Sequence, residues 1–192
     1  MTRIVVIDPQ PAVRAGLAMM LRTEPGMVPV GSAVGVGDGL ELVERQRPDV
    51  VLLDPQLLDG DGLGLCRRIR SLEHPPRVVF YTSDHEPTLG VLVRVAGADG
   101  LVDKSAAPQE LFEAIRVVAR GGTALPPIGP KDLEAAAGKV DADDLALLAM
   151  LMDRTSPNEV ADALHLDRRK LGRRIERLLG RLRGRPPRTR TA

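Results

Sequence analysis

Four polar residues stand at the ends of short β-branched, apolar segments in the N-terminal part of the chain. Asp8, Asp54 and Thr82 each come directly after such a segment, and Lys104 follows a weaker segment near Leu101. Together they supply two carboxylates, a hydroxyl and an ammonium. One carboxylate could accept a phosphoryl group and the other could hold Mg²⁺, so the four residues form a coherent set for phosphoryl transfer. Each residue type alone is common as a cap or surface charge, so the prediction depends on the fold bringing the four together.

A basic cluster near the C-terminus is the second feature with chemistry. Residues 167–192 hold 11 Lys/Arg and two Asp/Glu, although the whole chain has a formal net charge of only +1. On a helical projection of residues 168–183, apolar side chains gather on one narrow face, namely Leu171, Ile175, Leu178 and Leu182. Basic side chains cover the remaining surface of this predicted helix, which suits a recognition helix in the major groove of DNA. The residues expected to contact DNA are Arg168, Arg169, Lys170, Arg173, Arg174 and Arg177. A solvated amphipathic helix, or a basic face for an acidic partner or membrane surface, is the alternative.

The elements that must position the first group follow a βα alternation over residues 1–120. Strands are predicted at residues 4–7, 28–34, 50–53, 78–81 and near Leu101, and helices at residues 13–21, 40–46, 63–69, 89–96 and 111–119. This order predicts an α/β fold with a doubly wound, five-stranded parallel sheet of the flavodoxin-like type. Ligand sites in such sheets lie beyond the carboxyl ends of the strands, where the four polar residues would meet. Gly35, Gly37 and Gly39 lack the full pattern of a phosphate loop and predict a turn.

A second, small all-α domain is predicted after a Gly-, Pro- and Ala-rich linker at residues 121–139, which has room for one helical turn near Leu133. Helical patterns follow at residues 143–152, 157–164 and 168–183. Ser156 and Glu159 can form a capping box around Pro157, and Asp167 can cap the next helix after a tight turn, which predicts a helix-turn-helix. The predicted division is 1–120, 121–139, 140–184 and a basic tail at 185–192.

Composition excludes several classes of protein. The chain has 43% hydrophobic and 28% charged residues, as globular proteins do, and no apolar run reaches the roughly 18 residues of a membrane span. We therefore expect a cytoplasmic protein with no membrane partner. Cys66 is the single cysteine, so neither an intramolecular disulfide nor a cysteine-rich metal site can form. No Ser/His/Asp or Cys/His arrangement supports hydrolysis, and we expect no enzyme activity.

The N-terminal part resembles the receiver domain of two-component signalling, and the whole chain resembles the NarL/FixJ family of response regulators. The resemblance is carried by IVVIDPQPAVRAGL, DVVLLDPQLLDGDGL, VVFYTS and AGADGLVDKSA. It implies that Asp54 is the phosphoacceptor position, that Asp8 and Asp54 belong to the Mg²⁺ site, that Thr82 is the switch hydroxyl and that Lys104 contacts the phosphate.

Several residues depart from the receiver pattern. Pro9 stands where the family usually has a second metal-site acid, Pro55 follows the phosphoacceptor, and Leu101 replaces an aromatic switch residue. Mg²⁺ is the one cofactor implied, and its site is weakened, so we expect Asp54 to be phosphorylated poorly or not at all. Two alternatives remain: Asp59 or Asp61 supplies a substitute metal ligand, or a small-molecule ligand or partner protein occupies the pocket and sets the domain's state.

The C-terminal part resembles the LuxR-type helix-turn-helix, through TSPNEVADALHLDRRKLGRRIERLLGRL. It departs from that pattern in its first segment, DADDLALL, and in ending on RGRPPRTRTA instead of a closing helix. We expect the tail to be a disordered arm that contacts phosphates. Only three aromatic residues are present, none in the basic segment, which favours duplex over single-stranded DNA.

The leading prediction is a DNA-binding transcriptional regulator that acts as a homodimer on double-stranded DNA, with an atypical receiver under ligand or partner control. One alternative is a conventional response regulator phosphorylated by a sensor histidine kinase. Others are a receiver-type adaptor that binds a protein, and an RNA-binding antiterminator, neither with a DNA target. The spacing of the capped helix-turn-helix favours DNA.

Overall fold

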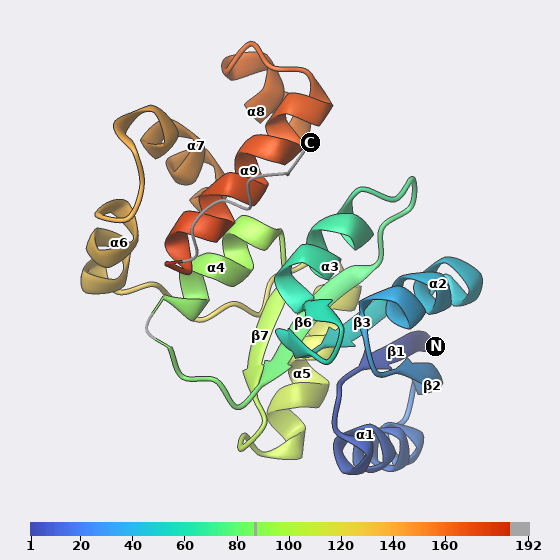
Figure 1. Cartoon of the computed structure of the whole chain (residues 1–192). Helices are drawn as coiled ribbons and strands as arrows, with labels where there is room; N and C mark the ends of the chain where they lie inside the picture. Colours follow the sequence, from blue (N-terminus) through green and yellow to red (C-terminus); the bar gives the residue numbers. More distant parts are fainter. Residues whose placement is uncertain (87, 185–192) are drawn as a thin grey trace. The chain divides into compact units, whose positions relative to one another are not determined.

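The computed structural model of the chain describes residues 1–86 and 88–184 (Figure 1). Its contacts divide it into two units, Met1–Asp84 with Ala98–Pro126, and His85–Gly97 with the described residues from Pro127 onward. The sequence-based division ended the first domain at residue 120; the contacts carry that unit to Pro126, because Leu101 and Asp99 exchange backbone hydrogen bonds with Ala124 at 3.0 and 2.8 Å. The predicted tail at 185–192 lies outside the described residues. Within the described ranges, none of the helices has the length and apolar character needed to span a bilayer.

The first unit is built on a five-stranded sheet whose strands run parallel in the order β2-β1-β3-β6-β7. These strands are β1 (Thr2–Ile7), β2 (Met27–Ala33), β3 (Val50–Leu53), β6 (Arg77–Thr82) and β7 (Gly100–Asp103). All four residues of β3 are buried, as an apolar run covered on both faces requires. The predicted α/β class and the doubly wound parallel sheet are therefore confirmed.

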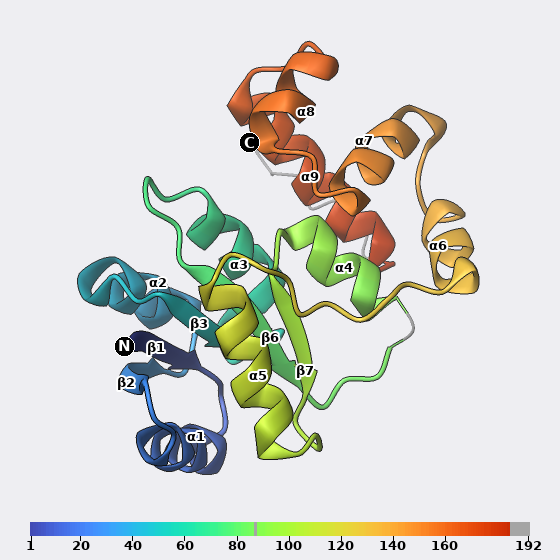
Figure 2. The same ribbon diagram turned by 180° about the vertical axis from the view of Figure 1, so that it is seen from behind.

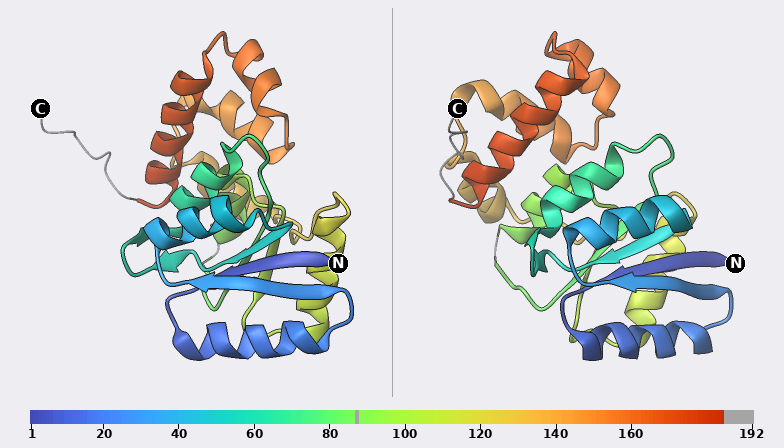
Figure 3. Two further views of the ribbon diagram at one scale, coloured as in Figure 1. Left: turned by 90° about the vertical axis from the view of Figure 1, so that its right-hand side faces the viewer. Right: turned by 45° about the vertical axis from the view of Figure 1, so that its right-hand side comes forward.

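Helices cover both faces of this sheet (Figure 3). They are α1 (Pro11–Thr23) and α5 (Pro108–Ala119) on one face, and α2 (Val36–Gln46) and α3 (Gly62–Arg70) on the other. Alternate strand residues point to opposite faces, so Ile4, Val6 and Leu52 join a core with Leu17 of α1 and Ile115 of α5. Both α1 and α5 begin with proline, whose fixed φ suits the first helical position.

Helix α2 corrects the prediction of a turn at the glycines, because Gly37 and Gly39 lie inside it. A Cβ at Gly39 would lie only 3.0 Å from Cδ1 of Ile7, so the missing side chain lets α2 approach β1. The local sequence signalled a break, and close packing between helix and strand accounts for the glycine instead.

A short antiparallel pair of strands, β4 (Gln56–Leu57) and β5 (Gly60–Asp61), follows Asp54 and was not predicted. Asp59 lies at its tip, where its carboxylate accepts hydrogen bonds from the backbone N–H groups of Val36 at 2.6 Å and Gly37 at 3.3 Å. Asp59 thereby caps α2. A Cβ at Gly35 would lie 2.3 Å from Oδ1 of Asp59, so this cap requires glycine there.

The second unit consists of five helices within the described residues: α4 (Leu89–Ala96), α6 (Pro130–Ala137), α7 (Ala142–Met152), α8 (Pro157–Ala163) and α9 (Arg168–Leu182). Helix α4 packs against α7 and α9 and contacts α6 (Figure 2). Six of its eight residues are buried, as expected for a helix that is apolar nearly all round. Helix α6 occupies part of the predicted linker and is longer than the single turn expected near Leu133.

Candidate functional site

The carboxyl ends of β1, β3, β6 and β7 bring the four predicted polar residues together. The ammonium of Lys104 lies 2.6 Å from Oδ2 of Asp8 and 2.5 Å from Oδ2 of Asp54, so it bridges the two carboxylates. Thr82 belongs to the same edge, since its carbonyl accepts from the backbone N–H of Lys104 at 2.8 Å. Asp8, Asp54 and Thr82 are all buried, at 2%, 7% and 4% exposed. Two nearly buried carboxylates thus share one cation.

The remaining oxygen of each carboxylate is held by the same local turn. Oδ1 of Asp8 accepts from the backbone N–H of Gln10 at 2.8 Å, and Oδ1 of Asp54 accepts from Gln56 at 2.7 Å. Both turns have the sequence Asp-Pro-Gln. Because proline has no N–H, the first donor that each aspartate can reach lies two residues on. This repeated tripeptide can be read directly from the chain, but no role was predicted for it.

The electrostatics of this edge favour a charged lysine. Burial alone lowers the pKa of Lys104, but hydrogen bonds and charges from Asp54 and Asp8 outweigh that effect and leave its pKa above the usual value. Arg14 of α1 adds a second cation, donating to the carbonyl oxygen of Asp8 at 2.7 Å. The sequence analysis gave Arg14 no role.

The donor set fits poorly to the Mg²⁺ that the receiver resemblance implies. Oδ2 of Asp8 and Oδ2 of Asp54 both contact the Lys104 ammonium, and Pro9 supplies no carboxylate where a third would stand. The substitute ligands considered from the sequence serve as helix caps: Asp59 caps α2, and Asp61 accepts from the N–H of Leu63 at 2.9 Å at the start of α3. Among the described residues, His, Cys, Asp and Glu nowhere gather in a group of three or more that could hold a metal.

A cleft of about 540 Å³ opens beside Asp54. Its lining combines carboxylates, hydroxyls, amides and leucines from the ends of β1, β3 and β6 and from β4; these are Pro9, Gln10, Asp54, Gln56, Leu57, Leu58, Thr82, Ser83 and Asp84. Leu58 is 76% exposed, so the rim carries an apolar side chain in solvent. The cleft can therefore accept a ligand with both polar and apolar parts.

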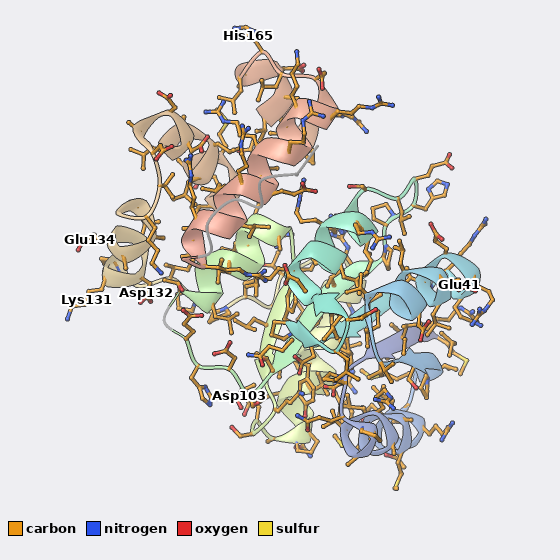
Figure 4. The ribbon with its side chains drawn as sticks, viewed as in Figure 1. Glu41, Asp103, Lys131, Asp132, Glu134 and His165 are labelled. Carbon is orange, nitrogen blue, oxygen red and sulfur yellow. The ribbon has the colours of Figure 1, made fainter. Side chains whose placement is uncertain are left out.

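In the second unit, α8 and α9 form the predicted helix-turn-helix corner. The side chain of Ser156 accepts from the N–H of Glu159 at 3.3 Å, while Glu159 accepts from the N–H of Ser156 at 3.0 Å, which completes the capping box. His165 has φ of 51° in the connecting turn, and Figure 4 shows it at the outer end, pointing away from both helices. Asp167 caps α9 by accepting from the N–H of Lys170 at 2.7 Å.

Helix α9 buries one apolar stripe and exposes most of its predicted cations. Leu179 is buried in addition to the four apolar residues expected, so the stripe is wider than predicted. Arg169, Arg173 and Arg177 are exposed. Arg168 and Lys170 are also exposed, but Arg168 donates to Oδ1 of Asn158 at 2.6 Å, and Lys170 lies 3.4 Å from Oδ2 of Asp167.

Arg174 differs from the other predicted cations. Only 20% of its side chain is exposed, and its Nε lies 2.5 Å from Oδ1 of Asp144 on α7. Arg181 makes a second contact with this acid, with Nη1 3.1 Å from Oδ2. Arg174 was predicted to contact DNA, and no role was predicted for Arg181 or Asp144. An acidic run at a helix start is normally solvated, so no local pattern distinguishes this buried acid from its neighbours.

Comparison with known proteins agrees with the receiver fold of the first unit. The family model for the response regulator receiver domain matches residues 4–116. The response regulator UvrY of Escherichia coli K12 is 28% identical over 176 residues, which cover 86% of this chain and 81% of UvrY. The crystal structure of a LuxR-family two-component response regulator from Aurantimonas sp. SI85-9A1 is 29% identical, with a TM-score of 0.62 over 70% of this chain and 94% of the other.

A likeness in fold extends over nearly the whole chain. RcsB of Salmonella enterica serovar Typhimurium, solved bound to a promoter, aligns with 94% of this chain and 91% of its own at a TM-score of 0.63 and 18% identity. The receiver match covers more than half of the chain, and the relatives are response regulators. The chain therefore belongs to the response regulators, and is one of the LuxR/NarL type with a receiver domain followed by a helical C-terminal part.

Proposed function

We propose that this chain is a transcriptional regulator that binds double-stranded DNA through α9. The observation that carries the proposal is the stripe of exposed arginines on α9, joined to α8 across a capped corner. Arginine in this position can bind guanine edges bidentately and contact phosphates. His165 extends from the corner itself, where it can approach a phosphate.

The first unit controls this activity in our proposal, with little or no phosphorylation of Asp54. Support comes from Pro9, which leaves this edge without the second acid of the metal site that the receiver resemblance implies. A small molecule or a partner protein bound at the cleft beside Asp54 sets the state of the receiver instead. The competing function is a conventional response regulator phosphorylated by a sensor histidine kinase.

The protein binds as a homodimer on paired half-sites in this proposal, because a single exposed helix reads only a few base pairs and dimers double the site. Adaptor and RNA-binding functions remain the candidates from other classes. The capped corner supports the choice of duplex DNA, since a short helix followed by a tight turn and a longer cationic helix is the order of elements that a helix-turn-helix uses to place one helix in a major groove.

Selection of genomic duplex fragments by the purified full chain tests the proposal. We expect recovery of a defined sequence, with an affinity that falls steeply with salt as counterions are released from the phosphates. A folded RNA of similar length, and the soluble proteins from a lysate of the cells that produce the chain, serve as competitors. Equal retention of all duplexes, or preference for the RNA, would contradict the proposal.

A further inference from the structure

One buried acid in the second unit holds two of the arginines of α9. Asp144, 6% exposed in the first turn of α7, contacts Nε of Arg174 through Oδ1 at 2.5 Å and Nη1 of Arg181 through Oδ2 at 3.1 Å. Nη2 of Arg174 also donates to the carbonyl oxygen of Asp143, and Arg181 pairs with the carboxylate of Asp141. We call Asp144, Arg174 and Arg181 the α7–α9 clamp.

The clamp lies at the border between the buried and exposed faces of α9. At about 100° per residue, Arg174 and Arg181 lie about 90° around the helix from Arg173. Arg169 and Arg177 lie about 40° to either side of Arg173, in the middle of the exposed face. The clamp therefore holds one edge of α9 against α7. Arg169, Arg173 and Arg177 form a separate stripe that faces solvent.

In the part of the chain that the structure describes, the arginines of the exposed stripe form no ion pairs like those of the clamp. Within residues 1–86 and 88–184, neither an ion pair nor a side-chain hydrogen bond engages Arg169, Arg173 or Arg177. In the clamp, by contrast, both arginines contact a buried carboxylate, and only 20% and 33% of the Arg174 and Arg181 side chains are exposed. A long arginine side chain left unpaired at that border would instead extend into solvent and reach any nearby phosphate.

We propose that Asp144 is a positioning residue that determines sequence specificity. It fixes the rotation of α9 about its axis and withholds Arg174 and Arg181 from DNA, so that base contacts come from the stripe of Arg169, Arg173 and Arg177. This inference rests on the proposed DNA binding. It adds that specificity depends on keeping two cations away from phosphates, whose contacts strengthen binding to every sequence alike.

Asp144→Asn in the full chain tests the inference, with Asp153→Asn as the matched control. Asp153 is an exposed acid at the other end of α7, so its substitution makes the same charge change without touching the clamp. Asp144→Asn frees Arg174 but leaves Arg181 paired with Asp141, so one additional phosphate contact should steepen the plot of log affinity against log salt by about 0.9. Between about 50 and 200 mM salt, binding of Asp144→Asn to random duplex should fall about threefold further than wild-type binding does.

Specificity should change in the opposite direction to nonspecific binding. We expect the ratio of affinities for selected and random duplex to fall about threefold in Asp144→Asn and to stay unchanged in Asp153→Asn. In a background of Arg174→Gln with Arg181→Gln, Asp144→Asn should leave the salt slope unchanged. Circular dichroism at each condition establishes that the variants are folded. Equal effects of the two asparagine variants, or a persisting slope change in the double-glutamine background, would overturn the inference.

A readout without DNA separates the clamp from the proposed function. The Nε–H of Arg174 should exchange slowly with solvent in NMR spectra of the free full chain, and rapidly in Asp144→Asn. Rapid exchange in the wild type would overturn the clamp, whatever the DNA result. Slow exchange in a wild-type protein that binds no duplex of any sequence would support the clamp and overturn the DNA-binding function, with the specificity role that rests on it.

Discussion

At the scale of single residues, Lys104 offsets part of the negative charge of Asp8 and Asp54 at the receiver edge. Its ammonium lies between Asp8 and Asp54, whose side chains are 2% and 8% exposed, so neither carboxylate has much contact with water. Removing one member of a buried charge group leaves the others uncompensated, which costs more than the group contributes when intact. The stability of the first unit should therefore depend on this lysine.

Lys104→Met should lower the free energy of unfolding at neutral pH by about 3 kcal/mol. Methionine keeps most of the side-chain volume, so the loss reports the missing charge and not a cavity. Adding Asp54→Asn should restore part of the loss because it removes one of the two unpaired carboxylates. Urea unfolding measures all three variants, and a stability of Lys104→Met equal to wild type would contradict the charge-balance argument.

The raised pKa of Lys104 predicts a dependence of stability on alkaline pH. A group whose pKa is higher in the folded than in the unfolded chain stabilises the fold fully below its unfolded value, near 10.5 for lysine, and loses that contribution as the pH rises through the folded value. Wild-type stability should thus fall more steeply above about pH 10.5 than that of Lys104→Met. Lys131, which projects from α6 into solvent in Figure 4, provides the control, and Lys131→Met should follow the wild-type curve.

Pro9 accounts for the weak phosphorylation that we expect of Asp54. Wild type should label slowly with a small-molecule phosphodonor in millimolar Mg²⁺, because one metal-site acid is missing. Pro9→Asp supplies that carboxylate and should raise the labelling rate at least about tenfold. Asp54→Asn in each background identifies the labelled residue. Rapid wild-type labelling that Asp54→Asn abolishes would show that the site works without the second acid.

At the scale of elements, α9 exposes some of its cations to solvent and engages others within the unit. Arg169→Ala and Arg173→Ala should each reduce discrimination between selected and random duplex by about 1–3 kcal/mol, since both side chains lie on the exposed stripe. Arg188→Ala, in the tail outside the described residues, should weaken binding to both duplexes alike. Competition binding at fixed salt measures the ratio, and an equal loss of both affinities in all three variants would argue against base contacts from α9.

The helices and strands differ in how much of their role could be predicted from the sequence. β-branched runs and helical spacing predicted the single strands and the capped corner, because these patterns lie within short stretches of sequence, and the alternating order of strands and helices predicted the parallel sheet. Local patterns did not predict the inward position of Arg174, since Arg173 and Arg174 are adjacent arginines and only the distant Asp144 separates their roles. The same limit applies to Gly39, whose role depends on its approach to Ile7 and Leu65.

At the scale of the whole molecule, neither of the two units is one continuous segment of the chain. The receiver match spans residues 4–116, yet α4, within that span, packs with α7 and α9 in the second unit. Its sequence, LGVLVRVA, contains one charged side chain, so the helix has almost no polar face for contact with solvent. The described chain has no closing helix after α9, so α4 supplies apolar cover that helices within residues 127–184 do not.

A fragment of residues 127–192 should therefore be less stable than the same residues in the full chain. Without α4, the apolar face of α9 loses the helix that packs against it in the full chain. Burial of apolar surface contributes about 25 cal/mol per Å², so losing some 60 Å² of contact speeds hydrogen exchange of the α9 amides about tenfold. The amides of α8, which packs on α9 itself, provide an internal reference. Equal protection of α9 in the fragment and the full chain would mean that α7, α8 and α9 complete their own core, and that α4 adds nothing to it.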